Sequence, residues 1–447
     1  MLTMDRPLRI AIFVGMFPVV SETFILRQIV GLLALGHHVD IYADTRSSDD
    51  SPSQAEIEEH KLLERTTFMD MPTECAPWEL SVWPLSGETW VPGGTRPIRN
   101  SLRAMRALPI FLRALTVEPR LAMSVLSRAE YGFQAQSLSV LYRLNKLLEK
   151  PARYDVLHAH FGPTGNSFRF ARQLWRAPLL VSFHGYDFTT IPRKQGPAVY
   201  HKLFAEADLV TVNSQFTRRS VAQLGCPEQK LKLLPVGLEL EAFPFKERIW
   251  RAGEPLRLLT VARLVEIKGH EFAIRALANL RQVNPNLRYD IIGEGPLRKK
   301  LENLIVELGL GETVFLHGAR DGRFIHQLMA SAHIGLLASV SVDGDQEGQG
   351  LFLQEAQASG LPVVATKHGA LPEGILPGKS GLLVPEGDSQ ALANQLKDLI
   401  AHPEAWPMMG LNGRKFVETR YDIRKLNQQL TQLYETARQQ FHCPSQS

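Results

Sequence analysis

Residues 343–373 read DGDQEGQGLFLQEAQASGLPVVATKHGALPE, and the order of loop, helix and strand in this stretch indicates the fold. A polar loop leads through a pair of glycines into a short apolar helix, which carries Glu355 and ends at Gly360. An apolar run of the type found in buried strands follows at 361–365. A helix that leads directly into such a strand is typical of one unit of a parallel α/β sheet.

Two carboxylates flank the start of this expected helix. Seven residues separate Glu347 from Glu355, so one lies in the loop and the other about two turns further along. Gly348 and Gly350 let the backbone approach a ligand closely, and the N–H groups of a helix N-terminus bind anions. A single glutamate here would more often be a solvated acid. The combination favours a ligand with hydroxyl groups at both ends and a phosphate between them, as in a nucleotide sugar.

Length and composition limit the class of protein. The 447 residues are enough for two domains, and 44% hydrophobic with 21% charged residues is ordinary for a globular protein. The net charge of +4 is too small to predict a nucleic-acid partner. The three cysteines show neither metal-site nor disulfide spacing, which predicts a cytoplasmic protein. The N-terminus lacks the pattern of a signal peptide, and no stretch reaches the ~18 apolar residues of a spanning helix.

The N-terminal half begins with a strand–helix–strand unit, and regular alternation resumes at Asp155. Gly15 follows the first apolar run, either as a plain tight turn or as a loop kept small so that a substrate can lie above it. The sequence leaves both interpretations open. Strands are expected at 8–14, 39–43, 156–159, 178–183, 208–212 and 231–235.

Polar residues stand at the ends of these expected strands, where ligands bind in open α/β sheets. His158 and His160 lie at one strand end, and His184 and Asp187 lie at the next. A histidine is more often structural than catalytic. Because Gly185 follows His184 and a carboxylate is close by, we predict that His184 belongs to the site. His158 and His160 are expected to support it.

Residues 96–128 contain seven arginines and a single acid, Glu118. This basic amphipathic stretch either lies on an anionic membrane surface or packs its apolar side on the protein. Pro97, Pro109 and Pro119 predict two short helices rather than one. At about 100° per residue, one face carries Arg99, Arg103, Arg106 and Arg113, and the other carries Leu102, Met105, Leu108, Leu112 and Leu115.

A second alternating block follows a segment that has the composition of a linker. Residues 235–255 contain several prolines and glycines without a clean period. Two blocks of strand–helix units predict two Rossmann-like domains that face each other across a cleft. We expect these domains at 1–240 and 254–420, with a final helix at 421–440. Strands of the second block are expected at 256–262, 289–292, 314–316 and 334–338.

Arg263 and Lys268 follow the first strand of the second block on one loop. A guanidinium fork and an ammonium group suit the oxygens of a diphosphate. Together they can replace a divalent cation by stabilising the charge on a departing phosphate. Two solvated charges would be the simpler interpretation. However, residues 343–373 independently predict an anionic ligand, and these two cations could bind it.

The remaining motifs indicate neither a metal site nor a hydride cofactor. Gly293 and Gly295 lie at a strand end but do not complete a dinucleotide-binding fingerprint. Asp343 and Asp345 have the spacing of an acidic metal motif, but they neighbour Glu347 instead of following an early strand. We therefore predict no metal and no cofactor.

Four segments together resemble the large retaining glycosyltransferase family 4, and within it the exopolysaccharide enzymes of the colanic acid and amylovoran type. The resemblance covers nearly the whole chain, and the combined motifs are highly specific. The segments are FPVVSETFILRQI at 17–29, ARLVEIKGH at 262–270, EGQGLFLQEAQASGLPVVAT at 347–366 and HGALPE at 368–373.

The resemblance implies a GT-B fold, a UDP- or GDP-linked sugar donor, retention at the anomeric carbon and no metal. Residues 1–240 would bind the acceptor, a glycan or polyprenyl-diphosphate-linked oligosaccharide, and 254–420 the donor. Residues 421–447 would cross back to the first domain. Arg263 and Lys268 would hold the diphosphate, Glu355 the ribose, and Glu347 and His184 the sugar. The implied donor contacts also include Gly15, Gly293, Gly295, Gly348, Gly350 and Leu351.

One residue departs from the family pattern, and two alternatives stay open. Gln349 stands where many members carry an aromatic residue between the glycines. The family mechanism is front-face attack, in which Glu347 binds the sugar and no protein nucleophile is required. The alternatives are a nucleotide-sugar epimerase or hydrolase on the same fold, and an inactive subunit that still binds the donor.

Overall fold

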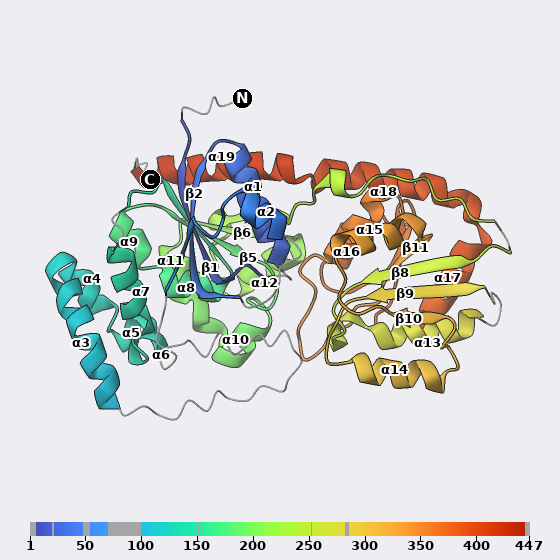
Figure 1. Cartoon of the computed structure of the whole chain (residues 1–447), viewed down its shortest axis with the longest axis horizontal. Helices are drawn as coiled ribbons and strands as arrows, with labels where there is room; N and C mark the ends of the chain where they lie inside the picture. Colours follow the sequence, from blue (N-terminus) through green and yellow to red (C-terminus); the bar gives the residue numbers. More distant parts are fainter. Residues whose placement is uncertain are drawn as a thin grey trace.

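The computed structural model describes residues 6–19, 22–47, 54–69, 100–149, 152–251, 253–281 and 286–442, with the side chains of residues 54 and 100–104 excepted. The chain forms two separate parallel sheets, each covered by helices (Figure 1). This arrangement confirms the predicted pair of Rossmann-like domains. Within the described ranges, no helix is both long and apolar enough to cross a membrane.

The first sheet has the strand order β3-β2-β1-β4-β5-β6-β7, and every pairing in it is parallel. Its strands are buried on both faces because apolar residues occupy consecutive positions. Ile10 and Ile12 face the layer of α1 and α19, whereas Ala11 and Phe13 face the layer of α7, α8 and α11. The strands are β1 (Arg9–Phe17), β2 (His38–Arg46), β3 (Thr66–Phe68), β4 (Val156–His160), β5 (Leu179–Phe183), β6 (Leu209–Val212) and β7 (Leu231–Leu233).

Helices cover both faces of this sheet, and several of them lie in one insertion between β3 and β4. In this insertion, α7 is anchored by a buried ion pair, because Arg143 donates to both carboxylate oxygens of Asp44 at 2.7 Å. The helices are α1 (Thr23–Ala34), α2 (Gln54–Glu59), α3 (Asn100–Val117), α4 (Pro119–Ser124), α5 (Arg128–Tyr131), α6 (Phe133–Gln136), α7 (Ser139–Leu148), α8 (Gly162–Phe168), α9 (Ala171–Trp175), α10 (Thr190–Gln195), α11 (His201–Glu206) and α12 (Gln215–Gln223).

The second sheet has the order β10-β9-β8-β11-β12-β13. Leu258 faces the layer of α13, α14 and α17, and its neighbour Leu259 faces the layer of α15, α16 and α18. The strands are β8 (Leu256–Val261), β9 (Leu287–Ile292), β10 (Val314–Leu316), β11 (Ile334–Leu337), β12 (Val363–Thr366) and β13 (Gly381–Val384). The helices are α13 (His270–Arg281), α14 (Arg298–Glu307), α15 (Gly322–Ser331), α16 (Leu351–Ala358), α17 (Ser389–Ala401) and α18 (Trp406–Arg420).

The last helix, α19 (Ile423–His442), returns to the first sheet, as predicted (Figure 1). Its hydroxyl groups hold it there: Tyr434 Oη lies 2.6 Å from His158 Nδ1, and Thr431 Oγ1 lies 3.1 Å from His37 Nε2. The chain crosses between the domains at two points that pair with each other, because Leu238 N–H donates to the Tyr421 carbonyl oxygen.

Three local expectations are wrong or incomplete. Gly15 lies inside β1 and not in a loop, because β1 stays paired with β2 as far as Phe17. Pro109 does not divide the basic stretch, since α3 runs through it as one helix, but a second helix, α4, begins at Pro119, so the predicted number of two helices is confirmed. Pro109 is exposed, and a helix tolerates a lost hydrogen bond where water can replace it. The part of this stretch at 96–99 lies outside the described residues. The short strands β3 and β13 were not expected.

Candidate functional site

A cavity of about 910 Å3 lies between the two domains. It opens at the carboxyl ends of both sheets, where β4, β5 and β6 face β8 and β11, so it lies where the strand order of each sheet reverses. Its volume is in the range typical of sites for small-molecule ligands. Of the predicted site residues, His184, Arg263, Lys268, Glu347, Gly348, Gly350, Leu351 and Glu355 line this cavity, whereas Gly15, Gly293 and Gly295 do not.

Glu347 is the centre of the polar network on the C-terminal wall. Lys268 Nζ donates to Glu347 Oε1 at 2.6 Å, and Ser339 Oγ donates to the same oxygen at 3.1 Å. Burial raises the pKa of Glu347, but the ion pair with Lys268 and the Ser339 hydrogen bond outweigh it and leave the pKa below its ordinary value. The carboxyl group is therefore ionised at neutral pH.

A second layer of hydrogen bonds fixes the backbone of Glu347. Its N–H donates to His368 Nε2 at 3.1 Å, so this nitrogen is the acceptor and the proton of a neutral ring lies on Nδ1. His368 Nδ1 lies 2.8 Å from Glu386 Oε2. These two contacts link Glu347, His368 and Glu386 and hold the turn before α16 in place.

Arg263 and Glu355 lie on the same wall as this network. Arg263 is open to the cavity. Desolvation by the surrounding protein atoms lowers its pKa, and the negative charges of Glu347 and Asp345 oppose that shift. Glu355 projects from α16, and burial raises its pKa while Arg27 of α1 lowers it. The two cations and two carboxylates predicted from the motifs thus lie on one wall of the cavity, and Glu266, Asp343 and Asp345 line the same wall.

The glycines have two different roles. A Cβ atom on Gly348 would lie 2.3 Å from the His184 carbonyl oxygen, so this glycine lets the two domains meet. A Cβ atom on Gly293 would lie 2.0 Å from the Ala262 carbonyl oxygen, and Gly295 is similarly close to Leu264. Gly293 and Gly295 therefore allow one loop to pack behind the loop of Arg263 and do not line the cavity themselves. Their contact with the donor stays a prediction.

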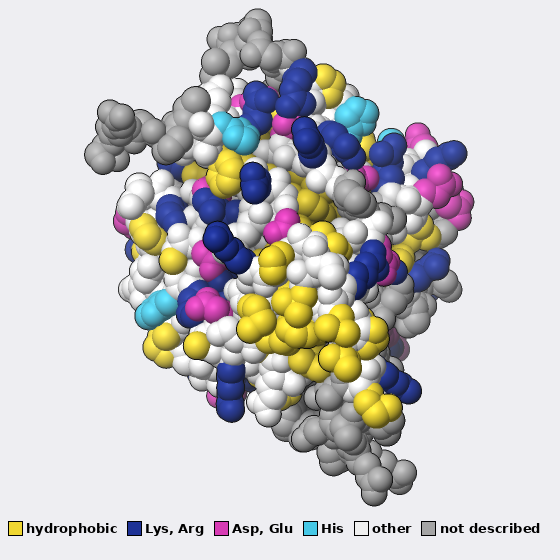
Figure 2. Space-filling view, turned by 90° about the vertical axis from the view of Figure 1, so that its left-hand side faces the viewer, with side chains coloured by type: hydrophobic (Ala, Val, Ile, Leu, Met, Phe, Trp, Pro, Cys, Tyr) yellow, Lys and Arg dark blue, Asp and Glu magenta, His cyan; other side chains and the backbone are white. Residues whose placement is uncertain are grey.

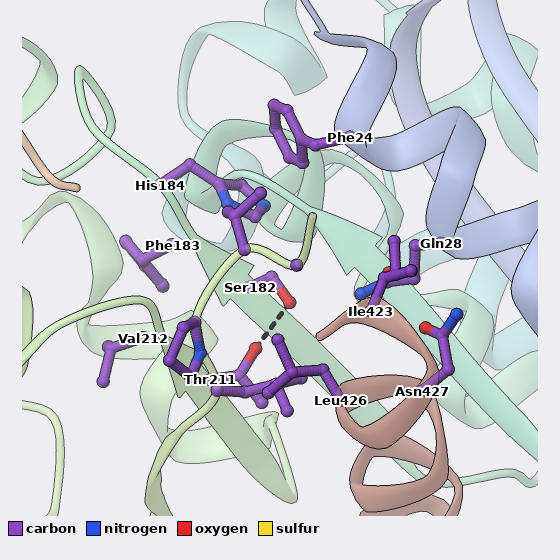
Figure 3. A pocket seen from close by; sticks show the side chains of 14 residues that line it. Phe24, Gln28, Ser182, Phe183, His184, Thr211, Val212, Ile423, Leu426 and Asn427 are labelled. Carbon is purple, nitrogen blue, oxygen red and sulfur yellow. Dashed lines mark hydrogen bonds between the residues drawn. The ribbon is translucent and has the colours of Figure 1, made fainter. Parts of the chain in front are cut away.

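His184 lies at the end of β5 on the N-terminal wall, next to Phe24 (Figure 3). His184 Nε2 lies 3.1 Å from His160 Nδ1, and burial lowers the pKa of His184 to about 3. The ring is therefore neutral at physiological pH. His158 lies deeper, bonded to Tyr434 and Ser182, and takes no part in the cavity wall.

Asp187 organises the loops of this wall from behind. Its buried carboxylate accepts hydrogen bonds from the N–H groups of His184, Gly185 and Gly162, at distances of 2.8 to 3.2 Å. Burial raises the pKa of Asp187 to about 6, against the effect of these bonds. Asp187 thus links the loops after β4 and β5 and acts through them.

Several residues of the N-terminal wall were not predicted as site residues. They lie at helix starts and in loops after strand ends. At these strand ends, only histidines were considered as site residues in the prediction. These lining residues are Glu22, Phe24, Phe161, Tyr186, Thr190, Arg193, Lys194 and Asn213.

Three hydrogen-bonded contacts hold the domains together around the cavity. Gln349, the departure from the family pattern, exchanges two hydrogen bonds with the backbone of Val236 at 2.8 and 2.9 Å. Thr189 Oγ1 donates to Asp345 at 2.6 Å. The Glu373 carboxylate accepts the N–H groups of residues 215 and 216, at the start of α12, at 2.7 Å each.

Acidic side chains, the potential ligands of a metal ion, line the cavity. In the part of the chain that the structure describes, no group of three or more His, Cys, Asp or Glu side chains is placed to hold a metal ion. The Asp345 carboxylate is bonded to Thr189, so this member of the acidic pair serves a contact between the domains. The cations that face the cavity are Arg263, Lys268, Arg193 and Lys194.

Comparison with known proteins identifies the family. The model named Glycosyl transferase 4-like domain matches residues 21–237, and Glycosyl transferases group 1 matches residues 243–416. The putative colanic acid biosynthesis glycosyltransferase WcaL of Salmonella typhimurium is 31% identical over 436 residues, 96% of this chain and 100% of that protein. The chain belongs to this glycosyltransferase family. The amylovoran biosynthesis glycosyltransferase AmsK of Erwinia amylovora is likewise 31% identical, over 96% of this chain and 99% of its own.

Solved structures show the same architecture as this glycosyltransferase. The crystal structure of Anabaena Alr3699/HepE in complex with UDP has a TM-score of 0.66 at 19% identity, covering 96% of this chain and 99% of that one. Sucrose-phosphate synthase from Thermosynechococcus elongatus has a TM-score of 0.65 at 21% identity, with the same coverage. The predicted GT-B fold is confirmed, and the enzyme is a transferase.

Replacing Glu373 with alanine removes both hydrogen bonds between α12 and the C-terminal domain. Bonds to a charged group contribute about 1.5–3 kcal/mol each, so the domains of Glu373→Ala separate more readily. The radius of gyration in small-angle X-ray scattering is expected to increase. Glu307→Ala, at an exposed position of α14, is the matched control and keeps the wild-type value. Superimposable curves for Glu373→Ala and wild type would show that this contact does not hold the domains.

Proposed function

We propose that this glycosyltransferase moves a sugar from a UDP- or GDP-linked donor to a glycan or polyprenyl-diphosphate-linked oligosaccharide during exopolysaccharide synthesis. Transfer retains the anomeric configuration and needs no metal ion. The observation that carries the proposal is the set formed by Arg263, Lys268, Glu347 and Glu355 on one wall of the interdomain cavity. Each of these residues belongs to a motif that resembles the donor site of the family.

The names of related proteins support both the pathway and the donor class. WcaL and AmsK are named for colanic acid and amylovoran biosynthesis. HepE has been crystallised with UDP and with UDP-glucose. A mannosyltransferase of Mycolicibacterium smegmatis, 28% identical over 67% of this chain, is described as GDP-mannose-dependent. These names leave the choice between UDP and GDP to experiment.

The proposed donor pose follows from the chemistry of the wall. Arg263 and Lys268 bind the diphosphate, and Glu355 accepts hydrogen bonds from the ribose hydroxyl groups. Glu347 and the N–H groups of Gly348 to Leu351 bind the sugar and its phosphate. His184, neutral because of its burial, contacts the sugar from the opposite wall.

Front-face attack accounts for the roles of these residues. The acceptor hydroxyl approaches the anomeric carbon on the face from which the diphosphate departs. The bond to the phosphate oxygen breaks as the bond to the acceptor oxygen forms, and the departing oxygen takes the hydroxyl proton. Arg263 and Lys268 stabilise the charge that develops on the phosphate, which is the task of a metal ion in other enzymes. Glu347 is held by Lys268 and acts as a binding group.

Lys268→Ala and Glu355→Ala are each expected to lower the rate of sugar transfer by at least about 100-fold, because each removes a group that holds the donor in the transition state. Radiolabelled transfer from the nucleotide sugar that raises the melting temperature most is the measurement. Lys299→Ala, an exposed lysine of α14, is the matched control. Normal turnover of both site variants, with unchanged circular dichroism, would refute the assignment.

The same assay covers the remaining parts of the proposal. Added EDTA leaves the rate unchanged, and the anomeric proton of the product shows the configuration of the donor in NMR spectra. An inverted product, or a rate restored only by magnesium, contradicts the proposed mechanism. Product formation at full rate from the donor alone would favour an epimerase or hydrolase.

We also propose that the enzyme works on the inner face of the cytoplasmic membrane, to which α3 and α4 attach it. Hydrophobic side chains gather on the end of the molecule that carries these helices, with lysines and arginines around them (Figure 2). Met105, Leu108 and Leu112 lie on one side of α3 and are each more than half exposed. The small residues Ala107 and Ala114 face the protein instead.

The exposed side of α3 supports the membrane interpretation of the basic stretch. Met105, Leu108 and Leu112 are not packed on the domain, whereas Ile110, Phe111 and Leu115 of the same helix are. Val117 at the end of α3, and Met123 and Phe133 beyond it, are exposed as well. Arg106 and Arg120 are exposed beside it. Contiguous exposed apolar groups with surrounding cations are typical of a surface that binds anionic lipid.

The double variant Leu108→Ser and Leu112→Ser is expected to reduce binding to phosphatidylglycerol vesicles by at least about tenfold, because each buried leucine contributes about 1.5–3 kcal/mol. Co-sedimentation is the measurement. Val306→Ser with Met408→Ser removes apolar residues that are equally exposed elsewhere and is expected to leave binding intact. Equal sedimentation of all three proteins, or no binding by the wild type, would rule out this membrane surface.

A further inference from the structure

A tight hairpin lies between β11 and α16 and lines the cavity. Val342 and Asp345 exchange two backbone hydrogen bonds, at 2.8 and 3.4 Å, and Asp343 and Gly344 form the tip between them. Both tip residues have positive φ angles, of 47° and 74°. An Asp-Gly pair is typical of a two-residue turn that requires positive φ at both central positions. We call this hairpin, residues 341–346, the strap.

The base of the strap is fixed to the C-terminal domain. Ser341 N–H donates to the Glu386 carboxylate at 2.7 Å, and Ser341 Oγ lies 3.1 Å from both oxygens of that carboxylate. Gln346 Nε2 donates to Ser341 Oγ at 3.1 Å, so the two ends of the hairpin are joined. The strap is thus an arm with an anchored base, and the position of its tip depends on what the tip contacts.

The tip of the strap contacts the opposite domain. Thr189 Oγ1, just before α10, lies 2.6 Å from Asp345 Oδ1 and 3.3 Å from the Gly185 carbonyl oxygen, so its proton is directed to the nearer carboxylate. A Cβ atom on Gly344 would lie 3.7 Å from Arg193 Nη1, at van der Waals distance. A hydroxyl–carboxylate hydrogen bond therefore joins the strap to the N-terminal wall, and bonds to an ionised acceptor are stronger than neutral ones.

The strap separates the cavity from solvent on one side. Val342, Asp345 and Gln346 are half-buried and line the cavity. Gly344 at the tip is exposed. The charge of Asp345 also acts on the Arg263 guanidinium, where it opposes the lowering of the pKa by burial. The strap thus lies near the cation that is proposed to hold the diphosphate, with the cavity on its inner side and water on its outer side.

We infer that the strap keeps water away from the reacting centre, and that Thr189 and Asp345 are positioning residues that hold it closed. The inference rests on the proposed function, because it concerns which nucleophile reaches the donor in that same cavity. Closing a site to water prevents hydrolysis of a reactive substrate. A closed strap therefore leaves the anomeric carbon to the acceptor hydroxyl group.

An open strap would permit hydrolysis of the donor. The oxygen of a water molecule attacks the anomeric carbon, and the bond from that carbon to the phosphate oxygen breaks. The departing diphosphate takes one proton of the water. The products are the free sugar and the nucleoside diphosphate, so the release of free sugar reports how often water replaces the acceptor.

The strap also accounts for the acidic spacing that the sequence shows at its tip. Asp343 tolerates positive φ better than most residues do, and Gly344 adopts it without a steric penalty. Asp345 supplies the carboxylate that Thr189 bonds. The Asp-Gly-Asp order thus fits a hairpin that reaches across the cleft and is held at its far end.

Thr189→Val keeps the shape of the side chain and removes its hydroxyl donor, whereas Thr189→Ser keeps the donor. Hydrolysis is measured without acceptor, as free sugar released from the member of a panel that raises the melting temperature most. The panel is UDP-glucose, UDP-galactose, GDP-mannose and GDP-fucose. Thr189→Val is expected to hydrolyse saturating donor at least about tenfold faster, the effect of losing one hydrogen bond to a charged group. Thr189→Ser, and Thr419→Val at an exposed position of α18, stay within about twofold of the wild type.

Hydrogen exchange gives a second measurement, which needs no donor. In Thr189→Val the backbone amides of residues 341–346 are expected to exchange at least about tenfold faster, because the strap opens more often. Asp345→Ala breaks the same contact from the other side. The double variant hydrolyses the donor no faster than the faster single variant, because both substitutions remove one shared interaction. A contact that only stabilises the fold would lower the melting temperature without raising hydrolysis.

The outcomes separate this inference from the proposed function. Unchanged hydrolysis in both Thr189→Val and Asp345→Ala overturns the strap and leaves glycosyl transfer standing, and so does an equal rise in Thr189→Ser. Faster exchange of residues 341–346 without faster hydrolysis also overturns it, since the strap would then open without admitting water to the donor. If none of the four nucleotide sugars raises the melting temperature of the wild type, the proposed function itself is contradicted.

Discussion

The ion pair between Lys268 and Glu347 is the interaction on which the cavity depends. Its members come from two separate motifs, one after β8 and the other before α16, and the 2.6 Å contact joins these loops. Two charges withdrawn from water are unfavourable unless each is paired and further bonded. Ser339 and the backbone contact with His368 supply the further bonds for Glu347. Lys268 also lines the cavity, where its remaining N–H donors are available to a ligand.

Close backbone approach makes this pair useful across the cleft. A Cβ atom on Gly269 would overlap the Ala338 carbonyl oxygen, and one on Gly348 would overlap that of His184. Only glycine allows both approaches, so the Lys268 loop packs on its own sheet while the Glu347 turn meets the opposite domain. Gln349 and Glu373 add polar contacts in the same region. These contacts hold the charged wall of the C-terminal domain opposite the aromatic wall of the N-terminal domain.

The sequence predicted the two sheets and one wall of the cavity, because both depend on local patterns. Apolar runs identified most of the strands, but β3 reads TTF and has no such run, and β13 reads GLLV, with only three apolar side chains after a glycine. Arg263, Lys268, Glu347 and Glu355 lie within two motifs, so their chemistry can be read from spacing. The opposite wall assembles Glu22, Phe161 and Tyr186 from three distant segments. No local pattern brings these residues together.

A crystal structure of the protein with the nucleoside diphosphate that stabilises it most would test the central claim directly. The account predicts the diphosphate between Arg263 and Lys268, with Lys268 Nζ in contact with phosphate oxygen and the ribose hydroxyl groups within hydrogen-bonding distance of Glu355. Glu347 would stay at the open, sugar-binding end. A nucleotide bound outside the interdomain cavity, or inside it with its diphosphate away from both cations, would contradict the account.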